Sequence, residues 1–372
     1  MEENIKKNET EKTQSTMDKI NAFLAKFHRV SATDKIFFTQ NIGVMLKSGI
    51  PLSKALKTLS IQTENKKFSQ ILLDLHYKID QGESLTNALE KYKKIFGELF
   101  VNMIKSGEIS GNLENVLAQL YTQLKKNHTL IIKIRNALIY PVIILLAMSG
   151  IGTAMFIFVI PKIMDVFNEV NAQLPLATRF LIKFSNIISQ HGTIFVISVV
   201  CFIIAFIKII KTKQGKNIFD LIILKLPIIS PIIKKINSAM FARTMSSLLK
   251  TDIQIVDSFK ITSNVTNNSA YKRACFLISE DVKKGISISK AMLSHTSIFS
   301  PILLQMISMG EETGSLDTTL DEIAIFYEEQ VFEIMNTLPS IIEPILMLVL
   351  GVAVGFMAVA IIMPMYSLTQ QI

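Results

Sequence analysis

The sequence repeats itself at an offset of 203 residues, and this repeat limits what the chain can fold into more than any other feature. Residues 38–161 align without a gap on residues 241–364. The matched positions include Phe38 with Phe241, Gly82 with Gly285, Phe96 with Phe299, Gly107 with Gly310, Glu108 with Glu311, Gly111 with Gly314, Pro141 with Pro344, and Gly152 with Gly355. One register kept over this length indicates a duplication, so both halves are expected to fold as the same unit.

The repeated unit has the apolar periodicity of helices. Leucine, isoleucine, valine and phenylalanine recur at intervals of three and four residues, interrupted by glycine, proline and serine. In the first copy the pattern predicts six helices, around residues 38–46, 51–59, 68–79, 84–89, 100–104 and 113–124. The sixth is expected to run on toward the apolar stretch that follows it. We therefore predict an all-α fold with two homologous six-helix bundles.

Three stretches without a charged side chain predict transmembrane helices: residues 136–160, 184–207 and 344–372. Each is long enough to cross a hydrocarbon core of about 30 Å as a helix. The mean hydropathy of +0.40 and the charged fraction of 19% fit a membrane protein better than a soluble domain.

The distribution of lysine and arginine predicts the orientation in the membrane. Residues 1–135 hold 21 of the 39 basic residues and residues 208–343 hold 15, whereas the loop after the first span has three. By the positive-inside tendency, both long segments are cytoplasmic and the C-terminus lies outside the cytoplasm. Anionic lipid beside the spans accounts for the net charge of +9, so we expect no direct nucleic-acid binding.

These observations predict a multi-pass protein of the inner membrane. The expected segments are a disordered cytoplasmic tail (1–34), a first cytoplasmic helical domain (35–135), transmembrane helix 1 (136–160), an extracytoplasmic loop (161–183), transmembrane helix 2 (184–207), a second cytoplasmic domain (208–343), transmembrane helix 3 (344–366) and an extracytoplasmic C-terminus (367–372).

Glu108 and Glu311, in SGEISG and MGEETG, are the best local candidates for a functional site. One interpretation is structural: the flanking glycines permit a tight turn, and the carboxylate favours the exposed amides at the start of the sixth helix. The other is a contact with a partner or a cation. Two glutamates this far apart in sequence do not by themselves define an acid–base pair or a metal site.

Residues 311–343 contain nine acidic side chains and no basic one. They form a solvated face, pair with basic residues elsewhere in the same domain, or offer an acidic surface to a basic partner. With Glu108 and Glu311, the partner-binding candidates are Glu312 and Glu322.

Three glycines are candidates for helix packing within the membrane. Gly351 and Gly355 form a G-x-x-x-G pair in the third apolar stretch, and Gly152 lies at the matching depth of the first. Small residues let helix backbones approach closely in lipid. Packing within one chain and between chains both remain open; we expect a homo-oligomer, with a dimer favoured.

Specific segments make the chain similar to the type II secretion F family. They are FFTQNIGVMLKSGIPLSKAL (37–56), KSGEISGNLENVL (105–117), QLPLATRFL (173–181), KLPIISPIIKKINSAMFARTMSSLLKTDIQIVDSF (225–259) and SMGEETGSLDTTL (308–320). The resemblance covers roughly residues 35–370. The sequence departs from it at Asp252 and Gln254, where the first copy has Gly49 and Pro51.

The resemblance implies an inner-membrane assembly platform of type II secretion or type IV pilus systems that is not an enzyme. Its implied partners are a cytoplasmic hexameric ATPase, which the acidic surface would suit, other inner-membrane assembly components, and pilins or pseudopilins. The platform of a competence pseudopilus for DNA uptake is an alternative within the same class.

A small-molecule transporter is the alternative from a different class. Transporters carry ionisable residues within the membrane along the path of the substrate, and the three apolar stretches have none except His191, at the outer edge of the second. No arrangement of histidines, nucleophiles or phosphate-binding glycines suggests catalysis, a cofactor or a metal. We therefore expect neither an enzyme nor a cofactor.

Overall fold

A computed structural model describes residues 30–161, 183, 185, 192–227 and 229–369. These residues form helices and short connections, with no strand among them. The chain divides into two compact units. The first joins the chain up to Leu130 with Ile233–Glu328, and the second joins Ile131–Ile232 with Glu329–Ile372. The first unit therefore contains both copies of the duplicated domain, which we call lobe 1 (30–130) and lobe 2 (233–328).

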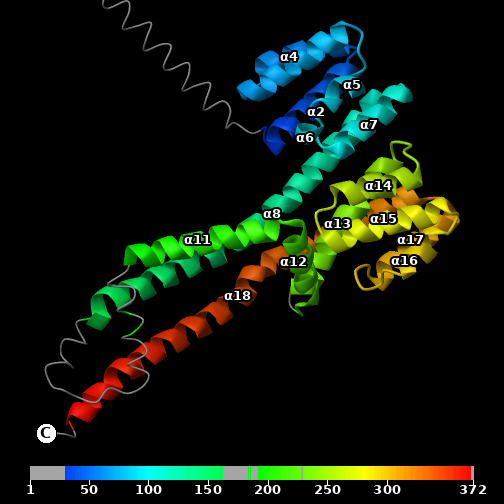
Figure 1. Cartoon of the computed structure of the whole chain (residues 1–372). Helices are drawn as coiled ribbons and strands as arrows, with labels where there is room; N and C mark the ends of the chain where they lie inside the picture. The colour runs from blue at the N-terminus through cyan, green and yellow to red at the C-terminus, as the bar shows by residue number, and fades with distance from the viewer. Residues whose placement is uncertain (1–29, 162–182, 184, 186–191, 228, 370–372) are drawn as a thin grey trace, which may run out of the picture. The chain divides into compact units, whose positions relative to one another are not determined.

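Lobe 1 is built from short helices that gather around one end of a long one (Figure 1). In chain order they are α2 (Ala32–Lys47), α3 (Leu52–Gln62), α4 (Lys66–Asp80), α5 (Leu85–Glu90), α6 (Lys93–Phe96), α7 (Glu98–Ile109) and α8 (Leu113–Ala154). Every helix expected from the periodicity overlaps one of these. The single turn α6 was not predicted, because four residues are too few to show a period.

Local sequence signals explain where the helices of lobe 1 begin. Ser31 and Asp34 form a capping box at α2, so this helix starts at Ala32, slightly before the expected domain boundary at residue 35. Asn65 and Ser84 cap α4 and α5 with their side-chain oxygens. Residues 1–29 of the expected tail lie outside the described residues.

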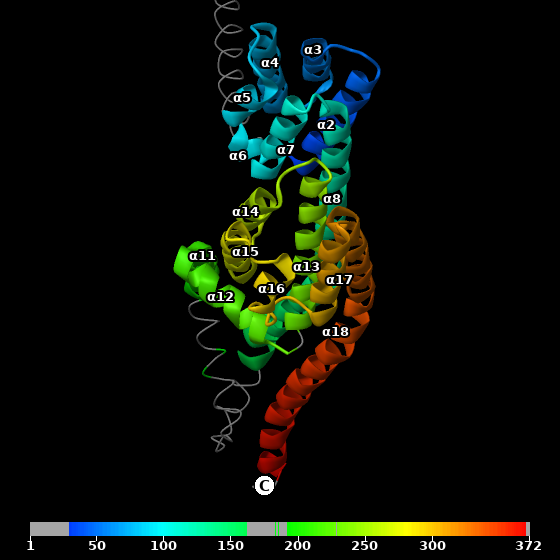
Figure 2. The ribbon, with the colours of Figure 1, turned by 90° about the vertical axis from the view of Figure 1, so that its right-hand side faces the viewer.

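Lobe 2 repeats this order of helices except for α6, whose equivalent residues, 296–299, are not helical. It contains α13 (Ile229–Leu249), α14 (Ile255–Val265), α15 (Ser269–Lys283), α16 (Ile288–Leu293), α17 (Pro301–Thr313) and the first part of α18 (Leu316–Thr369). Figure 2 shows the two groups of helices, with α14 of lobe 2 near α7 of lobe 1. The duplication in the sequence is thus a duplication of structure.

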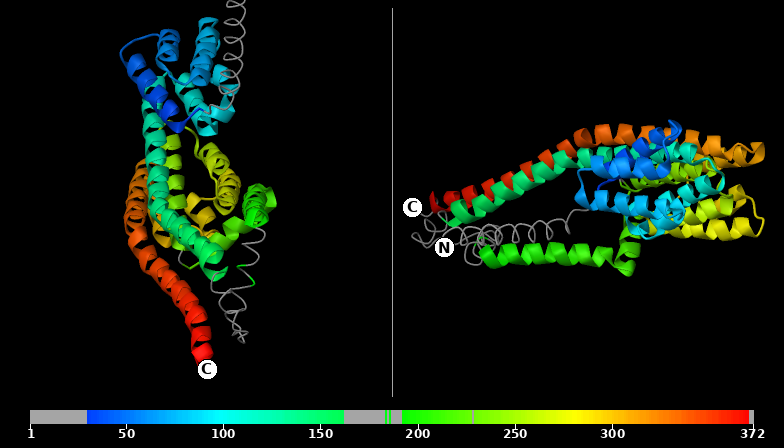
Figure 3. Two further views of the ribbon diagram at one scale, coloured as in Figure 1. Left: turned by 90° about the vertical axis from the view of Figure 1, so that its left-hand side faces the viewer. Right: turned by 90° about the horizontal axis from the view of Figure 1, so that it is seen from above.

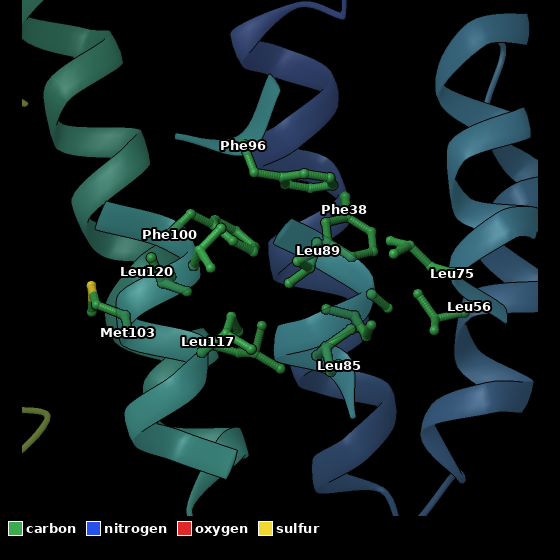
Figure 4. Packing of buried hydrophobic residues seen from close by; sticks show 14 of the residues in the cluster. Phe38, Leu56, Leu75, Leu85, Leu89, Phe96, Phe100, Met103, Leu117 and Leu120 are labelled. Carbon is green, nitrogen blue, oxygen red and sulfur yellow. The ribbon is translucent and has the colours of Figure 1, made fainter. Parts of the chain in front are cut away.

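Aromatic side chains organise the core of each lobe. In lobe 1, Phe38, Phe96 and Phe100 point toward one another from α2, α6 and α7, surrounded by leucines from α3, α4, α5 and α8 (Figure 4). The ring centroids of Phe38 and Phe96 are 5.8 Å apart. The equivalent rings of lobe 2, Phe241 and Phe299, are 5.2 Å apart.

Two helices continue from the lobes into apolar segments. Helix α8 runs without a break from Leu113 through Pro141 to Ala154, where the π-helical turn η1 (Met155–Val159) follows. Helix α18 is 54 residues long. Both can be followed as continuous ribbons in Figure 3. The sequence prediction that the sixth helix runs on into the apolar stretch is confirmed for α8.

By length and composition, the helices over Leu113–Val159 and Leu316–Phe356 could cross a membrane. The predicted second span overlaps α11 (Gly192–Lys211), which is followed by α12 (Lys213–Lys225). Residues 184 and 186–191, at the start of that predicted span, lie outside the described residues, as do 162–182 of the predicted loop and 370–372. The number of spans and their orientation therefore stay predictions.

Candidate functional site: the repeated glutamates and the contact between the lobes

Glu108 holds the start of a neighbouring helix in lobe 1. It lies on α7, and its carboxylate accepts hydrogen bonds from the backbone amides of Leu85 (2.7 Å) and Thr86 (2.9 Å) at the beginning of α5. The Thr86 hydroxyl donates a third bond of 2.6 Å. The carboxylate thus satisfies amides that have no partner within α5.

Glu311 repeats this arrangement in lobe 2. From α17 it accepts hydrogen bonds from the amides of Ile288 (2.5 Å) and Ser289 (3.0 Å) at the start of α16. The Ser289 hydroxyl donates a bond of 2.8 Å. The hydroxyl comes from Thr86 in lobe 1 and from Ser289 in lobe 2, but the three hydrogen bonds to the carboxylate are the same. We call this arrangement the glutamate clamp.

This geometry differs from the structural interpretation of the sequence in one respect. The carboxylate was expected at the start of the sixth helix, but it caps α5 in lobe 1 and α16 in lobe 2, the short helix that comes before its own. Its two amide partners come from residues 22 and 23 positions away. Periodicity cannot show this pairing, because the packing of separate helices creates it. Partner or cation binding by Glu108 or Glu311 stays a prediction.

Gly107 explains how α7 comes so close to the start of α8. A Cβ built at Gly107 would lie 2.8 Å from the Val116 side chain and 3.3 Å from the Leu113 Cα. At Gly310 a Cβ would meet Thr319 at 2.9 Å. These glycines permit a close approach of two helices, and Gly111, with φ of +67°, forms the predicted turn between them.

The acidic run has two environments. Glu312 and Glu322 are exposed, and Glu312 accepts a hydrogen bond from Ser308. Asp321 and Glu328 instead pair with Arg243 of α13. The internal-pairing interpretation therefore holds for part of the run, and the exposed glutamates keep their predicted role as partner-binding candidates.

Arg243 is the centre of a buried ionic network that joins α13 to α18 in lobe 2. Its guanidinium contacts Glu328 at 2.7 and 3.0 Å and also pairs with Asp321, to which Lys250 donates at 2.5 Å. Burial acts to lower the pKa of Arg243, but the hydrogen bonds and charges of Glu328 and Asp321 outweigh it and raise the pKa. The guanidinium is thereby held in its charged form.

Sequence reasoning left pairing within the domain open for the acidic run, but it did not name Arg243 or its partners. The signal was present in the repeat: Arg243 and Glu328 stand where lobe 1 has Gln40 and Lys125. Lobe 2 thus has a cation and an anion at two positions where lobe 1 has neither in that place. Such a double difference between the copies indicates an ion pair that only one copy forms.

The two lobes contact each other through different faces. Helices α7 and α8 of lobe 1 meet α13, α14 and α18 of lobe 2. The polar contacts are Ser106 Oγ to the Thr251 carbonyl (2.6 Å), Gln123 to Ser247 (2.9 Å) and Thr244 (3.3 Å), Asn264 to Glu98 (3.0 Å), and Lys126 to Glu328 (3.7 Å). Leu248 and Ile261 of lobe 2 join the core cluster of lobe 1.

A cavity of about 100 Å³ lies within this contact. Its lining includes Gln123, Lys126, Arg243 and Glu328. Among the described residues, no group of three histidine, cysteine, aspartate or glutamate side chains is arranged to hold a metal. Both cysteines are free.

The candidate helix-packing glycines face open space. Within the described chain, no atom lies within 4 Å of a Cβ built at Gly152, Gly351 or Gly355. No described helix of the chain fills these positions. Their role in packing between chains stays a prediction.

These features define a class: a duplicated all-helical protein whose two lobes each continue into an apolar helix. The sequence matches the family described as "Type II secretion system (T2SS), protein F" over residues 38–161 and 241–364. The chain belongs to this family. The matched ranges coincide with the two copies of the internal repeat.

Curated relatives resemble the chain over most of its length. It is 30% identical to the type IV pilus assembly protein PilC of Myxococcus xanthus, over 92% of this chain and 82% of the relative. It is 32% identical to PilC of Thermus thermophilus, over 90% and 82%. It is 29% identical to the type II secretion system protein F of Vibrio cholerae, over 91% and 83%.

Proposed function

We propose that the chain is a non-enzymatic inner-membrane assembly platform, which couples a cytoplasmic hexameric secretion ATPase to the assembly of pilin or pseudopilin subunits. The relatives named as type IV pilus assembly and type II secretion proteins support this role. In this proposal the platform crosses the membrane three times, with its N-terminus in the cytoplasm and its C-terminus outside, and acts as a homo-oligomer.

The continuity of α8 and α18 is the observation that carries the proposal. Each lobe is joined to an apolar helix with no flexible linker between them. A displacement of a lobe by a partner therefore reaches the apolar segment through one continuous helix. A chain that only anchored the lobes would not need this continuity.

A helix-breaking substitution tests this coupling. Thr129 is exposed on α8, just before the apolar segment. Thr129→Pro removes a helical hydrogen bond and kinks the helix, at a cost of about 3 kcal/mol. We expect fibre assembly or secretion to be lost while membrane insertion and ATPase copurification are retained. Thr129→Ala is the matched control, and normal assembly by the proline variant would contradict the proposal.

The exposed glutamates of lobe 2 are the proposed contact with the ATPase. Charge reversal with Glu312→Lys and Glu322→Lys is expected to weaken copurification of the ATPase several-fold. Glu90→Lys, an exposed charge reversal on lobe 1, serves as the control. Glu311→Lys would also lower the amount of ATPase that copurifies, but through loss of the α16 cap. This variant alone therefore cannot test the contact. Unchanged recovery with both exposed reversals would remove this surface from the proposal.

A further inference from the structure

The contact between the lobes joins two different faces of one repeated domain. We call the face formed by α13, α14 and the turn between them face A; in lobe 2 it carries Thr244, Ser247, Thr251 and Asn264, with Glu328 beside it. We call the face on α7 and α8 face B; in lobe 1 it carries Glu98, Ser106, Gln123 and Lys126. Within the chain, face B of lobe 1 packs on face A of lobe 2. Contacts between unlike faces of like units can repeat from unit to unit.

One face of each kind is left over in the same chain. The repeat register places face A of lobe 1 at Asn41, Val44, Ser48, Ile61 and Lys125. It places face B of lobe 2 at Pro301, Met309 and Phe326, with Glu329 of α18 directly after the lobe. These positions are exposed, apart from Asn41, which is half-buried. Val44 is 59% exposed where its counterpart Ser247 is 5% exposed, and Phe326 is 36% exposed where Gln123 is 4% exposed.

The exposed faces are apolar at the central positions where the internal contact is polar. Gln123 hydrogen-bonds Ser247 within the chain; the register replaces this pair with Phe326 and Val44. Around them Ile61 and Met309 are also exposed. Two apolar residues have thus replaced both members of a polar pair, which keeps the two faces complementary to each other. Exposed apolar side chains gathered at interface positions indicate a surface that another protein covers.

The charges are complementary as well, with their signs exchanged. Lys126 on face B of lobe 1 pairs with Glu328 beside face A of lobe 2. At the leftover faces the register puts Glu329 in the place of Lys126 and Lys125 in the place of Glu328. Both are exposed. An acidic and a basic residue thus occupy this pair of positions again, but here the acidic one is beside face B and the basic one beside face A.

We propose that face A of lobe 1 binds face B of lobe 2 from a second copy of this chain, in the arrangement of the internal contact. Val44 then packs on Phe326, Ser48 lies beside Met309, and Lys125 pairs with Glu329 of the second copy. Two chains joined twice in this way use every such face, so a closed dimer is the smallest complete assembly. The inference rests on the homo-oligomer in the proposed function and does not depend on the ATPase contact.

Disulfide trapping between separately tagged chains tests the interface in membranes, in cells without the ATPase. Both full-length chains carry Cys201→Ala, which leaves the buried Cys275 as their only native thiol. One chain carries Val44→Cys and the other Phe326→Cys. We expect a cross-linked heterodimer on oxidation. Because unlike faces meet, neither variant should cross-link to itself.

Matched controls define the outcome. Tyr77→Cys, equally exposed on α4 of lobe 1, should not cross-link to Phe326→Cys. Gln123→Cys with Ser247→Cys in one chain should form an internal disulfide and so test the contact from which the proposal starts. Absence of the heterodimer, or a strong Val44→Cys homodimer, would overturn the proposal. Cross-links of Val44→Cys or Phe326→Cys to another protein in place of the second copy would also overturn it.

A charge exchange provides a second, independent test. Lys125→Glu or Glu329→Lys alone should lower copurification of two differently tagged chains by about two- to five-fold, and the two together should restore it. No restoration would refute the ionic contact. Self-association is measured in cells without the ATPase, so a negative result for the dimer interface does not contradict the proposed ATPase contact. Likewise, the result with the Glu312 and Glu322 variants does not bear on the dimer interface.

Discussion

Lobe 1 and lobe 2 have the same order of helices apart from the single turn α6, but they join their first and last helices by different chemistry. In lobe 1, Gly43 of α2 lies against Leu117 of α8, where a Cβ would be 3.4 Å from the leucine Cβ. In lobe 2, Ser246 replaces the glycine and donates to the Asp317 carbonyl at 3.0 Å. Arg243, Asp321 and Glu328 add the ionic network nearby. The backbone arrangement thus tolerates either apolar or ionic packing.

The difference follows from what each face contacts. The first helix of lobe 2 is covered on one side by lobe 1 and on the other by α18, so Arg243 is buried, while its counterpart Gln40 is exposed. A buried guanidinium requires paired carboxylates, because an unpaired buried charge is strongly unfavourable. The copies therefore differ where their neighbours differ, and they are alike in their cores and glutamate clamps.

Removing Arg243 should have the largest effect. Arg243→Met leaves Glu328 buried with Lys126 as its remaining partner, and we expect lobe 2 to lose about 3–5 kcal/mol of unfolding free energy. The matched change Gln40→Met in lobe 1 should stay within about 0.5 kcal/mol. Urea-dependent labelling of Cys275 in a Cys201→Ala background measures unfolding of lobe 2.

The equivalent core position, Leu72, provides the probe for lobe 1 as Leu72→Cys with Cys275→Ala. Adding Glu328→Leu to Arg243→Met should recover part of the loss, since no buried charge then lacks its partner. Equal effects of Arg243→Met and Gln40→Met would show that the network does not distinguish the lobes.

The glutamate clamps should be equivalent, with a smaller effect. Glu108→Ala and Glu311→Ala each leave two helix-starting amides without an acceptor, so each should destabilise its own lobe by about 1–3 kcal/mol. The same thiol probes measure the loss. The exposed substitutions Glu114→Ala and Glu312→Ala are the controls. If Glu311→Ala were as mild as Glu312→Ala but abolished partner binding, the clamp would be a recognition site.

Much of the fold could be predicted from the sequence, because local periodicity and the repeat determine it. The helices from Phe38 to Leu124 follow from apolar spacing and from the stops at Gly49 and Gly82. The partners of Glu108 and Arg243 could not be predicted, since they come from residues 23 and 85 positions away. A carboxylate at a helix start was the right kind of role for Glu108, but only the close approach at Gly107 determines which helix it reaches.

Acid should lower the unfolding free energy of lobe 2 by only a fraction of the loss expected for Arg243→Met. Burial acts to raise the pKa of Asp321, but the hydrogen bond from Lys250 and the charge of Arg243 outweigh it and lower the pKa. A carboxylate with a lowered pKa in the folded state stabilises the fold above its unfolded pKa of about 3.9, and this contribution is lost as the pH falls through the folded value.

We therefore expect the urea midpoint of lobe 2 to fall between pH 5 and pH 3, with Asp321→Asn removing much of the fall. In lobe 1, burial acts to raise the pKa of Asp74, but hydrogen bonds from Tyr92 and Lys91 outweigh it and lower the pKa. Asp74→Asn should accordingly flatten the acid dependence of lobe 1 and leave that of lobe 2 unchanged. An unaltered profile in the Asp321→Asn variant would assign the acid sensitivity of lobe 2 to other carboxylates.

The smallest expected effect concerns the turn at which the copies depart from each other. Asp252 replaces Gly49 and keeps the left-handed backbone, with φ of 58° against 79°. The amides of Ile50 and Ile253 donate to the equivalent carbonyls of Met45 and Leu248 at 3.0 and 3.2 Å, so the geometry of the two turns is the same. Aspartate tolerates this conformation better than most residues, at a cost that glycine avoids.

Exchanging Gly49 and Asp252 measures the free-energy cost of the left-handed backbone conformation. A Cβ at Gly49 would meet no atom within 4 Å among the described residues, so Gly49→Asp adds strain without a clash. We expect it to destabilise lobe 1 by about 0.5–1 kcal/mol and Asp252→Gly to stabilise lobe 2 by less, because glycine also raises the entropy of the unfolded chain. Urea-dependent labelling of the thiols at positions 72 and 275 can distinguish the destabilisation of lobe 1 from the stabilisation of lobe 2. Destabilisation by Asp252→Gly would instead mean that the aspartate side chain itself supports lobe 2, a difference between the copies that backbone conformation does not explain.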